Sequence, residues 1–252
     1  MERKLADIHE FLKEVHEEKQ KLKLGEVLLF RGHNGKGDLL PKLLREELLD
    51  PNEKPFDIED KLYDEFKIRA TPYLDMNKDF QNEWNLLVLA QHYGLKTRLL
   101  DWTENPLVAL FFTVYGSNFI ENGEEREIWM LKATDDNIIN INNNKNTEVF
   151  RSYTNKFVFK PSAISQRVVT QSSWFTHHSK KLQKLNDSKS IKNELICFSI
   201  PDRLKKEDIE KYLTLMEINT HTLFPDLESL CKMLNEKKYK PKPPLVITSR
   251  IL

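Results

Sequence analysis

The segment 90–112 constrains the fold more than any other part of the chain. It reads AQHYGLKTRLLDWTENPLVALFF, a short strand pattern that leads directly into an apolar helix. Asn105-Pro106 places a proline in the first turn of that helix, where its missing N–H costs nothing. Because the helix is apolar on almost every side, we expect it to be central, with the strand beside it.

The same strand carries polar groups that a purely structural strand rarely needs. A cation, a carboxylate, an indole and a hydroxyl follow a nearby histidine, in the order His92, Arg98, Asp101, Trp102 and Thr103. Unpaired polar groups are costly to bury, so these residues either pair with one another or face a ligand. Each also has a structural explanation: a charge at a helix end, an Arg98–Asp101 pair, an indole in the core, and Thr103 or Asn105 as a helix N-cap.

Length and composition favour a globular protein without a bulk electrostatic field. Hydrophobic residues make up 39% and charged residues 31% of the 252 residues, and Lys+Arg and Asp+Glu both total 39. No apolar run is long enough for a membrane span, and the N-terminus lacks the apolar region of a signal peptide. We therefore expect a soluble, cytoplasmic protein with no membrane partner, in which Cys197 and Cys231 are buried, reduced thiols.

Hydrophobic periodicity predicts an α+β fold with a central, mostly antiparallel sheet flanked by helices. We expect strands near 27–30, 97–102, 127–133, 156–160, 167–171, 195–200 and 245–247. Helices are expected near 4–22, 41–49, 56–70, 84–94, 106–114, 202–216 and 224–236, and a polar surface loop near 137–146. The expected organisation is an amphipathic helix within residues 1–23 followed by a single globular unit, residues 24–252.

Two further groups of residues suggest a ligand. Arg31-Gly32 ends a buried strand, where arginine can bind phosphate or carboxylate at two points and glycine lets a ligand approach the main chain. The alternative is an ion pair between Arg31 and a core carboxylate such as Asp101. On the expected strand 167–171, Arg167 and Gln171 share one face, and Trp174, Phe175 and His177 follow, which would form a polar and aromatic pocket wall.

Several common catalytic patterns do not occur in the sequence. The residues Gly35-Lys36-Gly37 lack the spacing of a P-loop, and there is no GxSxG or HExxH motif. His177 and His178 would point to opposite faces of a strand, so we expect no metal site. Asp226 and Glu228 fit the first turn of a helix that starts at Pro225.

Taken in order, these pieces resemble the FRG domain family. The resemblance covers about residues 24–236 and rests on Phe30-Arg31-Gly32, the run 91–106, Arg167 with Gln171 and Phe175-Thr176, and the run 222–227. The family resemblance does not itself name a reaction.

A weaker resemblance is to the ADP-ribosyltransferase fold, in the order of Arg31-Gly32, then Trp102-Thr103 with its helix, then the segment 167–171. It implies NAD as substrate and no metal. By this resemblance Gly32 would hold the nicotinamide amide and Arg31 a phosphate or ribose, Trp102 or Trp174 would stack on a ring, and Thr103 would orient the ribose. Gln171 stands where a glutamate usually stabilises the oxocarbenium-like state, which leaves Asp101, Asp226 or Glu228 as alternative acids.

The resemblances imply a nucleotide-binding protein that transfers ADP-ribose to a protein or nucleic-acid acceptor, or cleaves NAD, as a toxin-like or phage-defence effector. An alternative is a non-catalytic module that binds a phosphorylated ligand or nucleic acid, and a third is that the polar residues only tie the strands together. The expected catalytic residues are Arg31, Asp101, Thr103, Arg167 and Gln171, and the expected ligand-binding residues are Gly32, His92, Arg98, Trp102, Trp174, Phe175 and His177.

Overall fold

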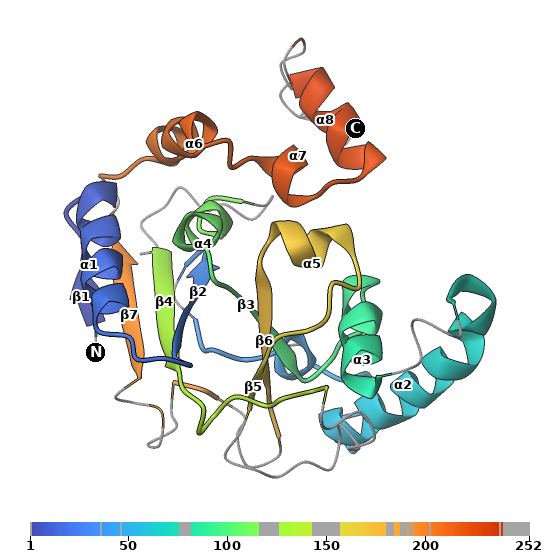
Figure 1. The fold of residues 1–252 in the computed structure, drawn as a ribbon. Helices are drawn as coiled ribbons and strands as arrows, with labels where there is room; N and C mark the ends of the chain where they lie inside the picture. Colours follow the sequence, from blue (N-terminus) through green and yellow to red (C-terminus); the bar gives the residue numbers. More distant parts are fainter. Residues whose placement is uncertain are drawn as a thin grey trace, which may run out of the picture.

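A seven-stranded sheet runs through the centre of the molecule, with strand order β1-β7-β4-β2-β3-β6-β5 (Figure 1). The computed structural model describes residues 2–35, 37–45, 47–75, 82–115, 126–142, 157–179, 184–186, 191, 194–201, 203–236 and 238. The strands are β1 (Glu2–Lys4), β2 (Val27–His33), β3 (Leu99–Thr103), β4 (Arg126–Ala133), β5 (Val158–Phe159), β6 (Ser173–His177) and β7 (Leu195–Ile200). β1 is parallel to β7 and the other neighbouring pairs are antiparallel, which confirms the predicted α+β class.

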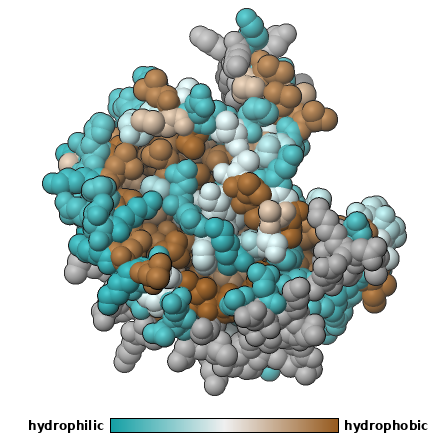
Figure 2. Space-filling model, viewed as in Figure 1, coloured by the Kyte–Doolittle hydropathy of each residue, from teal (hydrophilic) through white to brown (hydrophobic). Residues whose placement is uncertain are grey.

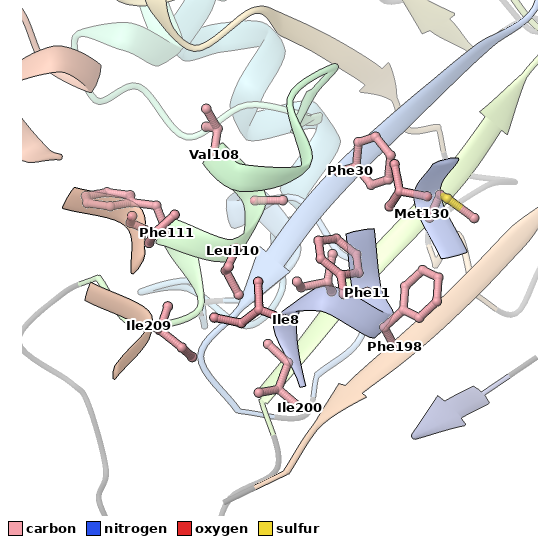
Figure 3. Close-up of a cluster of buried hydrophobic side chains, with 14 of the residues drawn as sticks. Ile8, Phe11, Phe30, Val108, Leu110, Phe111, Met130, Phe198, Ile200 and Ile209 are labelled. Atoms are coloured by element: carbon pink, nitrogen blue, oxygen red, sulfur yellow. The ribbon is translucent and has the colours of Figure 1, made fainter. Parts of the chain in front are cut away.

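Helices cover the two halves of this sheet separately. Against β2, β4 and β7 lie α1 (Ile8–Gln20), α4 (Pro106–Phe112) and α6 (Lys206–Leu215), and their apolar side chains form one core cluster (Figure 3). Beside β3, β6 and β5 lie α2 (Pro55–Ala70), α3 (Glu83–His92) and α5 (Gln166–Thr170). The remaining helical elements are η1 (Lys42–Leu44), η2 (Thr71–Tyr73), α7 (Thr220–Leu223) and α8 (Leu227–Glu236).

Helix α4 begins where the sequence predicts and lies in the core. The Asn105 side chain accepts a hydrogen bond from the Leu107 N–H at 2.9 Å, so Asn105 rather than Thr103 is the N-cap, with Pro106 as the first helical residue. The helix lies so close to β2 that a Cβ at Gly32 would be 1.9 Å from the carbonyl oxygen of Ala109. Close helix–strand packing is therefore what requires glycine at position 32.

The predicted strand 167–171 is wrong. Residues 167–170 belong to the short helix α5, and Gln171 is its C-cap; the N-cap is Ser165, whose hydroxyl accepts from the Val168 N–H at 3.3 Å. The strand in this region is β6 (Ser173–His177), which follows α5 after Ser172 reverses the chain direction with a φ of 47°. Positions four apart share one side of a helix, as alternate positions share one face of a strand. Arg167 and Gln171 therefore still lie on one side, but for a different reason.

Other elements differ from the predictions in smaller ways. Of the residues described within 41–49, only η1 is helical, and the first helix starts at Ile8 because residues 2–4 form β1. The N-terminal segment packs into the rest of the chain, with β1 paired to β7 and Phe11 in the same core as Phe30. The predicted strand 245–247 and residues 143–146 of the predicted loop lie outside the described residues.

The C-terminal helix α8 extends away from the sheet (Figure 1) and shows apolar side chains on its surface (Figure 2). Leu227 and Leu234 are 78% and 52% exposed. Cys231, on the same helix, is exposed, so the expectation of a buried thiol is wrong there, whereas Cys197 is buried. Among the described residues, no helix is both long and apolar enough to cross a membrane.

Candidate functional site

The sheet is weakest between β2 and β3, where the two strands separate. β2 pairs with β4 over seven residues and β3 with β6 over five, but β2 and β3 share only the pair Phe30–Thr103. Next to this pair, a side chain links the two strands in place of backbone hydrogen bonds: Nη1 of Arg31 on β2 donates to the carbonyl oxygen of Asp101 on β3 at 2.7 Å. The guanidinium thus satisfies a backbone acceptor that the separated strands would leave unpaired.

A hollow of about 230 Å³ opens at this separation, and we call it the strand-gap hollow. Phe30, Val108, Ala109 and Phe112 give it an apolar side next to α4. All five residues expected to be catalytic line it, together with Gly32 and Trp102: Arg31, Asp101, Thr103, Arg167 and Gln171. The structure therefore brings together side chains from β2, β3 and the α5 region that are up to 140 residues apart in sequence.

A second hollow of about 190 Å³, the basic hollow, adjoins the first. The two share Asp101, Arg167, Gln171 and Ser173, and together we call them the cleft. The basic hollow adds three groups that can carry positive charge, Lys42, Arg45 and His92, over an apolar floor that includes Phe175. Together the two volumes fall in the range of small-molecule sites, about 300–1,000 Å³.

The guanidinium of Arg31 is held by three neighbours. Besides the Asp101 carbonyl, its Nε donates to Nε2 of His33 at 2.9 Å, and Oδ2 of Asp101 lies 3.9 Å from Nη1. Burial lowers the pKa of Arg31 to about 10, with Asp101 opposing and Arg45 adding to the shift. Burial, with Arg31 and Arg45, lowers the pKa of His33 to about 3, so its imidazole is neutral and can accept this hydrogen bond.

Asp101 points outward into the cleft. Its side chain is 60% exposed, and Oδ1 accepts from Nε2 of Gln91 at 2.9 Å. Gln91 is oriented in turn by the Thr97 hydroxyl, which donates to its Oε1. Among the described residues that line the two hollows, Asp101 is the only carboxylate.

Arg167 and Gln171 form the wall shared by both hollows. The Arg167 guanidinium lies over the ring of Phe224, 4.7 Å from its centre, and Nε2 of Gln171 donates to the Leu223 carbonyl at 3.1 Å. His92 lies near Arg167, and burial first, then this cation, lowers the pKa of the imidazole, while Asp226 opposes the shift. The cleft therefore holds three arginines, Arg31, Arg45 and Arg167, and a histidine whose protonation is disfavoured.

Arg98 lies away from the cleft. It is 4% exposed and pairs with α2, its Nε 2.6 Å from Oε2 of Glu59 and its Nη2 2.7 Å from Oδ1 of Asp60. Burial raises the pKa of Glu59, and Arg98 opposes that shift. This arrangement does not agree with the alternative of an Arg98–Asp101 ion pair. It also does not agree with the expectation that Arg98 binds a ligand.

Some expected site residues use their polar atoms within the fold. The Thr103 hydroxyl donates to the Gln171 carbonyl at 2.6 Å and accepts from the Asn105 N–H at 3.0 Å. The indole N–H of Trp102 donates to Thr176 at 3.1 Å, and that of Trp174 donates to Glu104 at 2.5 Å. Trp174 and His177 line neither hollow, and His177 packs against the Trp84 ring at 5.3 Å.

The sequence did not single out several residues of the cleft. Lys42 and Arg45 come from η1, where nothing in the sequence distinguishes them from surface cations. Ser173 also lines both hollows, and the sequence did not indicate it because a strand was predicted at 167–171 and not at 173–177. Among the described residues no group of three His, Cys, Asp or Glu side chains could hold a metal ion.

Comparison with known proteins identifies one region. Residues 26–121 match the FRG domain, which includes β2, α3, β3 and α4 and therefore Arg31, Asp101 and the strand separation. The match ends before α5 and α7, so it is shorter than the resemblance seen in the sequence. No curated protein and no solved structure matched the chain, and the resemblance to ADP-ribosyltransferases stays a prediction.

Proposed function

We propose that this FRG-domain protein binds a nucleotide such as NAD in the cleft and transfers its ADP-ribose to an acceptor or to water. The observation that carries the proposal is the convergence of Arg31, Asp101 and Arg167 on one hollow at the separation of β2 and β3. The two cations suit the diphosphate of such a ligand. The single carboxylate suits the one centre of the ligand that becomes positively charged during the reaction.

The arginines supply the anion site. The Arg167 guanidinium lies over the Phe224 ring and has no hydrogen-bond partner among the described residues, and Nη2 of Arg31 likewise has no such partner there. These donors can therefore bind phosphate oxygens without breaking an existing bond. The apolar side of the strand-gap hollow, next to Val108 and Phe112, would hold an uncharged ring such as nicotinamide.

Asp101 is the residue that we assign to catalysis. In the proposed reaction the bond between the ribose C1′ and the nicotinamide nitrogen breaks, and its electron pair leaves with neutral nicotinamide. The positive charge that develops on the ribose would be stabilised by the Asp101 carboxylate. An acceptor oxygen or nitrogen, or water, then bonds to C1′ and gives up its proton, which would pass to the imidazole of His92 in the adjoining basic hollow, since the lowered pKa favours the neutral form.

The second candidate is binding without turnover, of a phosphorylated ligand or a nucleic acid. It is favoured by Gln171, a neutral amide where the resemblance would need an acid, whose Nε2 donates to the Leu223 carbonyl. Under this alternative the four cations Arg31, Lys42, Arg45 and Arg167 contact phosphates. Affinity would then fall steeply with salt and no product would form.

The test is release of nicotinamide from NAD by wild type and by Asp101→Asn, with binding of ADP-ribose measured in parallel. We expect Asp101→Asn to bind ADP-ribose and to release nicotinamide at least about a hundredfold more slowly. The matched control is Asp208→Asn, the same change at an exposed position of α6, which should behave as wild type. Equal turnover by Asp101→Asn would refute the assigned role, and binding without turnover by wild type would favour the second candidate.

A further inference from the structure

Arg167 reaches the cleft from a helix too short to be stable alone. α5 has five residues, and isolated helices of that length do not persist in water. Its C-terminal end is fastened by residues 220–224, which we call the α7 platform. The Leu223 carbonyl accepts from the Thr170 hydroxyl at 3.3 Å and from the Gln171 side chain at 3.1 Å.

The platform is fixed by the core and not by α5. Leu223 is 1% exposed and belongs to the same cluster as α4, and Asn219 caps α7 in a reciprocal pair with Thr222. The Phe224 ring stacks on Tyr115, with centroids 5.2 Å apart and an interplanar angle of 23°, and lies 6.3 Å from Phe112. The ring under Arg167 therefore has a position set by α4 and the residues that follow it.

We propose that Phe224 is a positioning residue that holds the Arg167 guanidinium at the shared wall of the cleft, ready for an anionic group of the ligand. The inference rests on the proposed function, because it assigns Arg167 to a bound phosphate. A guanidinium carbon 4.7 Å from a ring centre is within the range of a cation–π contact. Such a contact fixes the plane of the guanidinium and leaves its N–H donors free, whereas an ion pair would use them.

The consequence is preorganisation. A long arginine side chain that is already ordered loses less conformational freedom when an anion binds. Phe224 follows α7 and lies outside residues 26–121, so the FRG domain match gives no indication of this role. The α7 platform would thus support a binding site that joins β2, β3 and α4 of the matched region to α5 and β6 outside it.

The first test uses ADP-ribose as the probe and compares dissociation constants. Phe224→Leu should weaken binding roughly tenfold, because it keeps apolar bulk but removes the ring face, and Phe224→Tyr should restore affinity to within about twofold of wild type. Tyr212→Leu is the matched control, since it removes a ring packed on the same cluster whose ring contact is with His9 and not with Phe224 or Arg167. Wild-type affinity in Phe224→Leu, together with weak binding by Arg167→Ala, would overturn the inference.

A second readout needs no ligand. The charge of Arg167 contributes to the lowered pKa of His92, behind burial and against Asp226, so displacement of the guanidinium should raise that pKa. By NMR titration of the seven histidines, with His92→Gln for assignment, Phe224→Leu should move the His92 pKa toward its value in Arg167→Ala. Phe224→Tyr and Tyr212→Leu should leave it unchanged.

The two readouts separate the inference from the function on which it rests. If wild type does not bind ADP-ribose, the proposed function fails, and the His92 titration alone decides whether Phe224 positions Arg167. An unchanged His92 pKa in Phe224→Leu would overturn the positioning role in that case.

Discussion

Substitution of Gly32 by alanine tests how closely α4 packs on β2. The added Cβ would lie 1.9 Å from the Ala109 carbonyl oxygen, whereas ordinary contacts begin near 3.4 Å, so α4 would have to retreat by roughly 1.5 Å. The obstructing atom belongs to the backbone of a helix, so a side-chain rotation cannot relieve the clash. The strain must be taken up by movement of the helix.

The cost follows from what that movement separates. Val108, Leu110 and Phe111 of α4 are buried in the core cluster that α4 shares with β2, and burial of each stabilises the fold by about 1.5–3 kcal/mol (Figure 3). A gap of about 0.5–1 Å already removes a quarter to a half of the contact energy, so a retreat of roughly 1.5 Å that is partly relaxed by neighbouring side chains should remove about that share. The free energy of unfolding should therefore fall by roughly 2–3 kcal/mol, in line with other overpacked cores.

Urea denaturation of wild type and Gly32→Ala measures this loss directly. The matched control is Gly37→Ala, where the nearest atom to the new Cβ is His33 Nδ1 at an ordinary 3.8 Å. We expect the control to change the free energy of unfolding by less than about 0.5 kcal/mol. A Gly32→Ala variant as stable as the control would refute the close approach of α4, and with it the packing reason for this glycine.

Two further predictions concern buried charges. Arg98→Met leaves the buried Glu59 without its cation and should lower the free energy of unfolding by about 3–5 kcal/mol, measured by urea denaturation; a loss under about 1 kcal/mol would contradict the buried pair. Because the pKa of His33 falls to about 3 in the folded state, only the unfolded state takes up this proton between pH 6.5 and 3. His33 should therefore lower the free energy of unfolding by up to about 1.4 kcal/mol for each pH unit of acidification. Denaturation of His33→Gln across this pH range should show a shallower dependence of the free energy of unfolding on pH than wild type. An equal dependence would contradict the lowered pKa of His33.

Local sequence signals predicted the parts of the fold that depend on local interactions. The Asn105-Pro106 helix start and the apolar pattern of α4 follow from capping and periodicity, and both are confirmed. The segment 167–171 was predicted to be a strand because Val168, Val169 and Thr170 are β-branched, which is typical of strands. The Ser165 cap and the backbone of Ser172 at positive φ decide the outcome, and the latter is not visible in sequence.

The candidate site could be predicted only in part. Arg31, Asp101, Arg167 and Gln171 stood out because they interrupt or follow apolar patterns, and the structure places them around one hollow. Partnerships formed at long range could not be predicted. Arg98 pairs with Glu59, a residue of α2 that is 39 positions earlier, and no local pattern distinguishes that glutamate from the other acids of its helix.

The central claim is that a nucleotide occupies the cleft between β2, β3 and α5. NMR chemical-shift mapping of the full chain with ADP-ribose tests it most directly, because the backbone signals report where the ligand lies. We predict saturable shifts that are largest at Gly32, Asp101, His92 and Gln171, with α1 and α6 unaffected. The absence of saturable shifts at millimolar ADP-ribose, or shifts that map to α1 and α6 instead, would contradict the account.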